Sequence, residues 1–183
     1  MKKLFVLILA VLFLAACSSA PPEPEEEPTT ITINGEEYAL DIARLTLREQ
    51  RLTDADIVPL GSLTSVTHLE LRLNEITNIR PVSRLTTLEH LDLSFNEIIS
   101  IKELETLTNL RNLDLRFNFI EDISPLRRLN NLTTLDLGTN NISDVTPLMS
   151  LVNLQTLYLN DNPIDEAMHP VLRDALPDCK IYF

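Results

Sequence analysis

The sequence contains no tryptophan and few aromatic residues, which make up 5% of the chain against 44% hydrophobic residues. A core of stacked aliphatic side chains therefore fits the composition better than a core built around a few large rings. Lys and Arg are also scarce, at 15 against 27 Asp and Glu, and the formal net charge is −12. This deficit argues against binding to nucleic acid, whose phosphates need basic residues, and against docking on anionic lipid through charge.

The two cysteines, Cys17 and Cys179, are too few for a disulfide framework. Residues 1–16 predict an export signal, with a basic start, an apolar run from Leu4 to Leu14 and two small residues before Cys17. The run is too short to span a hydrocarbon core of about 30 Å comfortably. The segment Leu14-Ala-Ala-Cys17 resembles the lipobox of bacterial lipoproteins, which implies cleavage before Cys17 and acylation of that residue. The alternative is an ordinary secreted protein with a Cys at its cut site.

Residues 17–30 follow as the lipidated Cys17 and a Pro/Glu-rich stretch with almost no apolar content. Such a stretch cannot bury a core, so we expect a disordered tether. At about 3.1 Å per residue, it would reach roughly 40 Å. The leader and tether together predict a bacterial membrane location, lipid-anchored and facing outside the cytoplasm.

Residues 31–62 predict an amino-terminal cap. Two alternating runs flank Asn34-Gly35, the strongest short signal for a β-hairpin. Leu45, Leu47 and Gln50 then resemble a degenerate repeat, with Gln in place of a recurring Asn. The 22-residue repeats that follow predict a solenoid, and a solenoid needs such a cover because its first unit would otherwise expose aliphatic core to water.

Residues 63–150 form four complete units of 22 residues, 63–84, 85–106, 107–128 and 129–150. A Leu-x-Leu pair recurs in each unit and predicts a short strand with its leucines turned inward, so that adjacent units pair as a parallel sheet. Prolines in three of the units indicate a return path on the opposite, convex side. Three residues after each Leu-x-Leu comes an Asn, whose side-chain amide can form hydrogen bonds with the backbone of the buried turn. This column is Asn74, Asn96, Asn118, Asn140 and Asn162.

The unit L-x-x-L-x-x-L-x-L-x-x-N-x-I resembles the leucine-rich repeat family. The 22-residue length and segments such as Asp122-Ile-Ser-Pro-Leu126 look like its bacterial internalin-like class. The resemblance covers residues 45–183 and implies an α/β solenoid, a horseshoe with a short parallel sheet on its concave face that binds a protein. Unlike internalins, the sequence shows few repeats, no sorting motif and no appended immunoglobulin-like or cell-wall-binding module.

Residues 151–183 predict the last repeat and a carboxy-terminal cap of one helix and one strand. Apolar residues from Ile164 to Leu176, including Val171, recur with helical spacing, and Pro170 breaks or restarts that helix. Cys179, Ile181 and Phe183 alternate on a final strand. We expect Cys179 to be a buried thiol without a partner.

The residues that point outward from the strands are the candidate binding surface. They include a row of acidic residues on successive strands, which needs relief from Arg72, Arg116 or a ligand because like charges on neighbouring strands repel. They also include an apolar stripe of Leu73, Phe95 and Phe117 at the strand ends. The complete predicted surface is His68, Glu70, Arg72, Leu73, His90, Asp92, Phe95, Asp114, Arg116, Phe117, Phe119, Asp136 and Tyr158.

Two more specific functions of this surface, a metal site and a hydrolase triad, are not supported by the residues. His68 and His90 with nearby carboxylates have the residue types of a metal site, but no closed ligand set is evident. His90, Asp92 and Ser94 have those of a hydrolase triad, but steps of about 6.6–7 Å along a strand are too long for the hydrogen bond between nucleophile and base. We therefore expect no enzyme, no cofactor and no metal.

The sequence favours a membrane-anchored, monomeric, extracytoplasmic module that binds a protein or peptide through the concave face. The alternative is a structural or envelope-assembly lipoprotein that uses its convex face or caps. The concave sheet offers only about 460 Å² if about six strands are spaced by ~4.8 Å, whereas a standard interface needs about 800 Å² on each side. Flanking loops must then contribute, or the ligand is small or weakly bound.

Overall fold

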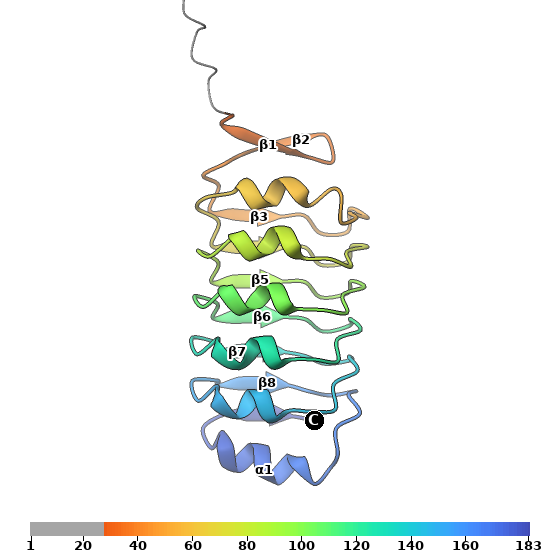
Figure 1. Ribbon diagram of the computed structural model, residues 1–183, viewed down its shortest axis with the longest axis vertical. Helices are drawn as coiled ribbons and strands as arrows, with labels where there is room; N and C mark the ends of the chain where they lie inside the picture. The colour runs from red at the N-terminus through yellow and green to blue at the C-terminus, as the bar shows by residue number, and fades with distance from the viewer. Residues whose placement is uncertain (1–27) are drawn as a thin grey trace, which may run out of the picture.

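The computed structural model describes residues 28–183 as a solenoid with a hairpin at one end and a helix at the other (Figure 1). The predicted leader 1–16, Cys17 and most of the predicted tether lie outside the described residues. The strands are β1 (Thr30–Ile33), β2 (Glu36–Ala39), β3 (Arg44–Thr46), β4 (His68–Glu70), β5 (His90–Asp92), β6 (Asn112–Asp114), β7 (Thr134–Asp136), β8 (Thr156–Tyr158) and β9 (Lys180–Tyr182). No helix within residues 28–183 is long and apolar enough to cross a membrane.

Strands β3 to β9 form a seven-stranded parallel sheet in chain order. From β4 to β8 each residue lies opposite the residue 22 positions later, such as Leu91 opposite Leu113. Arg44 of β3 pairs instead with His68, 24 residues on, so the degenerate repeat carries two extra residues. The predicted solenoid and its parallel sheet are confirmed.

One face of the sheet is covered by five 3₁₀ helices, one for each unit (Figure 1). Four of them have a proline in their first two positions, where the missing N–H costs no helical hydrogen bond. They are η1 (Val58–Ser62), η2 (Arg80–Arg84), η3 (Lys102–Thr106), η4 (Ser124–Arg128) and η5 (Thr146–Ser150).

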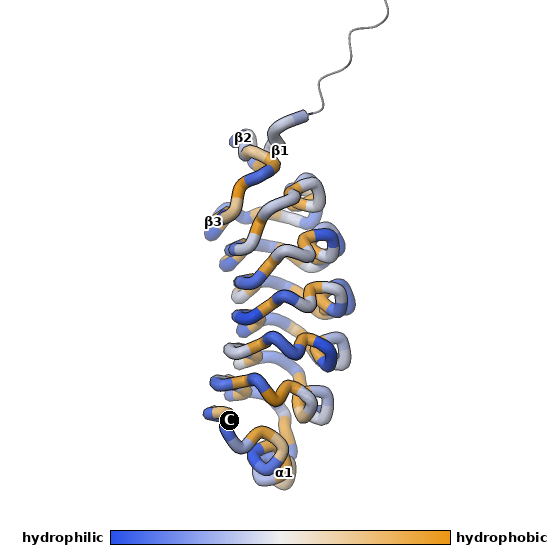
Figure 2. The backbone as a smooth tube through the Cα atoms, turned by 90° about the vertical axis from the view of Figure 1, so that its left-hand side faces the viewer, coloured by the Kyte–Doolittle hydropathy of each residue, from blue (hydrophilic) through white to orange (hydrophobic). Residues whose placement is uncertain are grey.

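The core lies between the sheet and the 3₁₀ helices. Leu91, Leu93 and Leu104 of one unit are at most 2% exposed, and their counterparts in the neighbouring units are buried as well. Each turn of the coil accordingly repeats the same succession of apolar and polar segments (Figure 2). Burying a leucine side chain contributes about 1.5–3 kcal/mol relative to its exposure, so the stacked aliphatic columns hold the units together.

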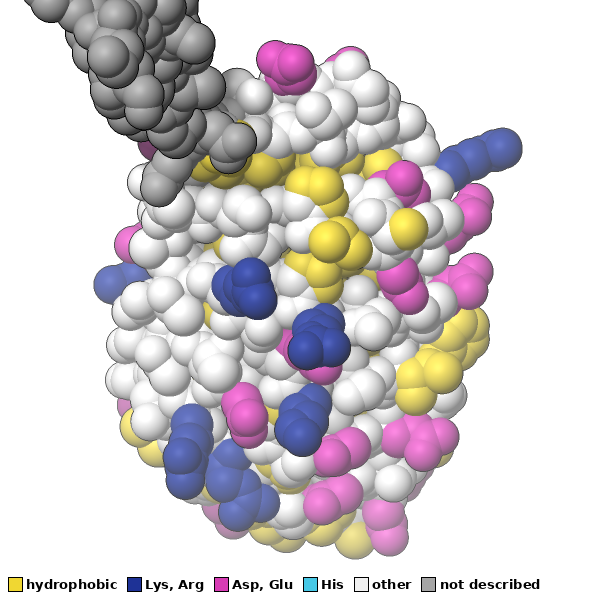
Figure 3. Space-filling view, turned by 45° about the horizontal axis from the view of Figure 1, so that its top comes forward, with side chains coloured by type: hydrophobic (Ala, Val, Ile, Leu, Met, Phe, Trp, Pro, Cys, Tyr) yellow, Lys and Arg dark blue, Asp and Glu magenta, His cyan; other side chains and the backbone are white. Residues whose placement is uncertain are grey.

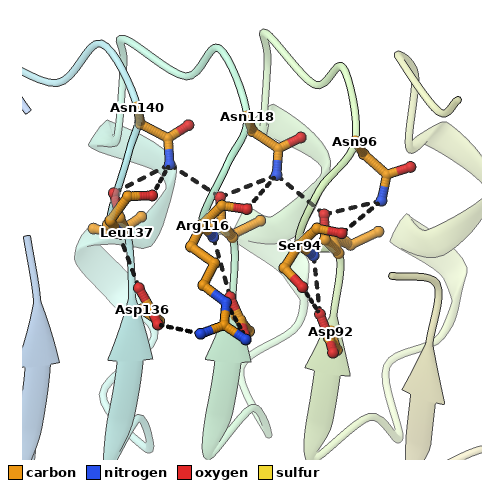
Figure 4. Close-up of polar contacts among 12 residues, drawn as sticks. Asp92, Ser94, Asn96, Arg116, Asn118, Asp136, Leu137 and Asn140 are labelled. Atoms are coloured by element: carbon orange, nitrogen blue, oxygen red, sulfur yellow. Dashed lines mark hydrogen bonds and ion pairs between the residues drawn. The ribbon is translucent and has the colours of Figure 1, made fainter. Parts of the chain in front are cut away.

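The side chains of the Asn column, which we call the Asn ladder, form hydrogen bonds with the backbone of the turn that follows each strand (Figure 4). Asn96 donates through Nδ2 to the carbonyls of Leu71 and Leu93, both at 3.0 Å, and its Oδ1 accepts the N–H of Ile76 at 3.1 Å. Asn74, Asn118, Asn140 and Asn162 make the same kinds of bonds. Each amide thus links its own turn to the preceding unit and pairs backbone groups that burial would otherwise leave unpaired.

The amino-terminal hairpin covers the open end of the solenoid. Asn34 and Gly35 have φ of 50° and 81°, as a two-residue type I′ turn requires. Ile31 and Ile33 of β1 are buried against the first unit. Strand β1 begins at Thr30, one residue before the predicted start of the cap.

The carboxy-terminal cap is the short helix α1 (Met168–Ala175) followed by β9. Pro170 is the third helical residue and therefore sits in the first turn, where its missing N–H is harmless. The helical spacing placed Val171 on one apolar stripe with Leu172 and Leu176, but Val171 is 45% exposed, whereas the two leucines are buried. The prediction of a buried Cys179 is also wrong. Its free thiol is half-buried, although burial still raises its pKa.

Candidate functional site

The uncovered face of the sheet, which we call the sheet face, presents one outward side chain from each end of every three-residue strand. It contains a shallow hollow of about 310 Å³. The hollow brings together seven of the predicted site residues, His68, Glu70, His90, Asp92, Asp114, Asp136 and Tyr158. This face corresponds to the predicted concave face.

The acid row consists of Glu70, Asp92, Asp114 and Asp136, which lie opposite one another on adjacent strands. The three aspartates also close the strand ends, because Oδ1 of each accepts the backbone N–H two residues later at 2.9–3.1 Å. These bonds give Asp a local structural role at this position, in addition to its charge.

The repulsion among the carboxylates of the acid row is reduced by Arg116 and by Arg48, which the sequence did not indicate. Nε of Arg116 lies 3.3 Å from Oδ2 of Asp114, and its Nη1 lies 3.8 Å from Oδ2 of Asp136 (Figure 4). Arg48, from the degenerate repeat, pairs with Glu70. The expectation that Arg72 relieves the row is wrong. Its guanidinium carbon lies 4.7 Å from the ring centroid of Phe95, and no ion pair in residues 28–183 includes it.

The centre of the acid row is electrostatically unfavourable. Burial, with the charges of Asp92 and Asp136, raises the pKa of Asp114 to about 6 against the pull of its backbone bond and of Arg116. Burial also raises the pKa of Asp136. Asp114 and Asp136 share the guanidinium of Arg116, and Asp92 has no ion pair within residues 28–183, so the folded chain carries uncompensated negative charge in a half-buried place.

The apolar stripe, which we call the rim, comprises Leu73, Phe95 and Phe117. All three have positive φ, between 53° and 56°. A left-handed backbone is unusual for bulky residues and costs about 1 kcal/mol or more at each. The rings of Phe95 and Phe117 stack with centroids 4.2 Å apart, while Leu73 and Phe117 remain 37% and 45% exposed.

The apolar surface continues beyond the rim onto the side of the solenoid. Phe119 is 53% exposed, and its backbone lies beside the preceding unit, since its N–H donates to the carbonyl of Ile98. Ile99, which sequence reasoning missed, is 67% exposed in the same turn region. Hydrophobic side chains gather at this edge, over the turns that follow the strands (Figure 3). The isolated isoleucine gave no periodic signal, since its counterparts 22 residues away are Thr77 and Glu121.

The two histidines of the sheet face stack on each other, with ring centroids 4.1 Å apart. Burial and the neighbouring His90 lower the pKa of His68. Within residues 28–183, no group of three or more His, Cys, Asp or Glu is arranged to hold a metal ion. Ser94 is fully buried and donates to Asp92 at 2.6 Å, so its hydroxyl does not face the solvent.

The carboxy-terminal end of the sheet face is aromatic. The rings of Tyr158 and Tyr182 stack at 4.7 Å, and Nζ of Lys180 lies 5.4 Å from the Tyr182 centroid. Sequence reasoning did not place Tyr182 on this face. The alternation of Ile181 and Phe183 on the last strand was the available signal, because it turns Tyr182 to the opposite side.

Comparison with known proteins places these features in a family. Models of leucine-rich repeats match residues 62–79, 86–128 and 130–168. Among solved structures, a leucine-rich repeat protein of Leptospira interrogans is 33% identical with a TM-score of 0.73, over 79% of this chain and 38% of its own. No curated protein matches the sequence.

Two internalins of Listeria monocytogenes are also similar. The internalin inlF is 26% identical with a TM-score of 0.62, over 81% of this chain and 50% of its own. Internalin C2 is 30% identical with a TM-score of 0.60, over 80% of this chain and 74% of its own. The present chain thus spans half or less of the first two structures. The repeat-model matches and these structural relatives show that the chain belongs to the leucine-rich repeat family.

Proposed function

We propose that this protein is a non-enzymatic binding module that captures a protein or peptide through its sheet face and rim. Solenoids of this kind generally use an extended sheet face for binding. The observation that carries the proposal is the rim, where Leu73 and Phe117 have a left-handed backbone and bulky apolar side chains that remain exposed. The turn has this left-handed residue at Thr139 and Asp161 as well, so the rim is distinguished by its exposed apolar side chains at a position that polar residues also fill.

Exposed apolar side chains outside the sheet enlarge the surface that is available for binding. The sheet alone is too small for a standard interface of about 800 Å² on each side. Phe119 and Ile99 extend the apolar surface around the edge, and Tyr182 extends it along the sheet. Exposed aromatic side chains are the usual anchors of a protein interface.

We further propose that the domain is anchored in a bacterial membrane by acylation of Cys17 and faces outside the cytoplasm. The support is the resemblance of Leu14-Ala-Ala-Cys17 to a lipobox. Metabolic labelling with an alkyne fatty acid should mark the wild-type chain and leave a Cys17→Ser variant unmarked. Equal labelling of the two would overturn the anchor while leaving the binding surface untouched.

Capture of a partner from the native envelope tests the binding proposal. The full chain would be crosslinked in place and compared with a variant combining Phe95→Ala, Phe117→Ala and Asp114→Lys, checked for folding by circular dichroism. Val152→Ala is a matched control, because this exposed residue lies on the opposite edge, between η5 and β8. We expect the wild type and the control to hold a protein that the triple variant loses. Equal capture by all three would favour the alternative, an envelope-assembly protein that uses its convex face or caps.

A further inference from the structure

The repeats differ at one position in a way that leaves a gap on the sheet face. Arg116 lies between an acid of its own unit, Asp114, and the rim ring of the preceding unit, Phe95. The residues 22 positions later are Gly138, Asp136 and Phe117. The carboxylate and the aromatic ring are therefore repeated, but the arginine between them is not.

The place left by the missing arginine is a real hollow. It measures about 350 Å³ and is lined by Phe117, Asp136, Gly138, Tyr158 and Asn160, with Arg116 at one side. Gly138 is buried, and a Cβ built on it would lie 3.0 Å from Oδ1 of Asn160 and 3.2 Å from Oδ1 of Asp136. The backbone at Gly138 is outside the left-handed region, so the turn itself does not require glycine there.

The chemistry around the hollow suits an organic cation. Aromatic faces and a carboxylate attract guanidinium and ammonium groups, and Phe117 and Tyr158 supply two rings beside the half-buried Asp136. The chain itself holds a guanidinium near such a ring twice, since the guanidinium carbons of Arg72 and Arg116 lie 4.7 and 5.7 Å from the centroid of Phe95, and Arg116 contacts carboxylates as well. A second cation would also add to the compensation of Asp136, which shares Arg116 with Asp114, and of Asp92, which has no ion pair within residues 28–183.

We propose that the hollow over Gly138 receives an arginine or lysine side chain of the protein partner, which takes the place that Arg116 has beside Asp114 and Phe95 one unit earlier. This inference rests on the proposed function and deepens it. The partner presents a basic residue to Asp136 and, next to it, an apolar residue that packs on Phe117 and Phe95.

Titration of the full ¹⁵N-labelled chain with N-acetyl-arginine amide tests the inference. N-acetyl-citrulline amide is the matched probe, because it has nearly the same shape without the charge. We expect saturable shifts of the backbone amides of Gly138, Tyr158 and Asn160 with the arginine probe, and binding about tenfold weaker with the citrulline probe. Equal binding of the two probes, or the absence of saturable shifts at these amides, would overturn the proposal.

Two glycine variants complete the test. Gly138→Arg supplies the missing side chain from within and should abolish binding of the arginine probe. Gly61→Ala should retain it, because that glycine is remote from the sheet face and a Cβ there meets nothing closer than 3.4 Å. Should Gly138→Arg fail to fold, Gly138→Ser copies the natural Ser94 of another unit and should weaken binding severalfold. Unchanged binding in a folded Gly138 variant would contradict the inference.

The same variants separate this inference from the proposed function. If the triple variant of the sheet face loses the partner but Gly138→Arg holds it normally, the proposed binding function stands and the cation subsite is overturned. The opposite result is also informative. If the arginine probe binds selectively but no partner is captured through the sheet face, the cation subsite stands and the proposal that a protein partner occupies it is overturned.

Discussion

Each rim residue directly precedes a residue of the Asn ladder in the sequence, yet the two sets have opposite effects on the fold. Asn118 is buried and bonds three backbone groups at 3.0 Å. Phe117, one residue earlier, is 45% exposed and sits in a left-handed backbone. One residue stabilises the turn, whereas its neighbour strains it. A single turn can therefore show which side chains serve the fold and which are available for function.

The largest effect should come from breaking the ladder. Asn118→Ala leaves the N–H of Ile98 without a partner and removes one of the two amide bonds that the carbonyls of Leu93 and Leu115 each accept, the other coming from Asn96 and Asn140. We expect the free energy of unfolding to fall by about 2–3 kcal/mol, since a buried unpaired N–H keeps its desolvation cost and two further hydrogen bonds are lost. Urea denaturation measures the loss. Asn109→Ala is the control, because its side chain bonds the carbonyl of Thr86 in an exposed position and should change stability by less than about 0.5 kcal/mol.

Lowering the pH should show how much the charged acid row lowers the free energy of unfolding. Asp114 has a pKa of about 6 in the folded chain and an ordinary value of 3.8, so the folded state binds its proton more tightly. Protonation therefore favours folding, and this contribution to stability should rise as the pH falls through 6 and level off below about 4. The contribution of Asp114 should be about 1–2 kcal/mol once solvent screening is allowed for. Denaturation of wild type and Asp114→Asn across this range measures it. A parallel pH dependence in the two proteins would contradict the account.

The rim itself can be relaxed. Phe117→Asn places a residue that tolerates the left-handed region at φ of 53°. Relief of strain should offset the lost stacking on Phe95, so stability should change by less than about 1 kcal/mol. Chemical denaturation checks this. A loss above about 2 kcal/mol would show that Phe117 belongs to the structural set with Asn118, and the contrast between ladder and rim would fail.

The smallest effect should come from the edge of the acid row. The Arg48–Glu70 pair is half exposed, with 51% and 35% of the two side chains accessible. Arg48→Ala should therefore cost less than about 0.5 kcal/mol, because exposed ion pairs contribute little. Thermal unfolding at low and high salt would detect a larger, salt-sensitive loss if the pair stabilised the degenerate repeat substantially.

The features that could be predicted from the sequence are those that every unit repeats. The columns of Leu and Asn predicted the strands, the parallel pairing and the buried turns, because a fixed spacing admits one stacking register. The features that were missed depend on differences between units. Arg48 lies in a degenerate repeat with two extra residues, and Arg72 turns toward a ring instead of the acid row. Such choices among side-chain conformations depend on the neighbouring unit and leave no periodic signal.

Site-specific photocrosslinking from the rim tests the central claim most directly. A benzophenone amino acid would replace Phe117 in one full-length chain and Val152, on the opposite edge, in another. Both would be irradiated in the native envelope. The account predicts a discrete protein adduct from position 117 and none from position 152. An adduct from position 152 alone would contradict it and assign the contact to the opposite edge.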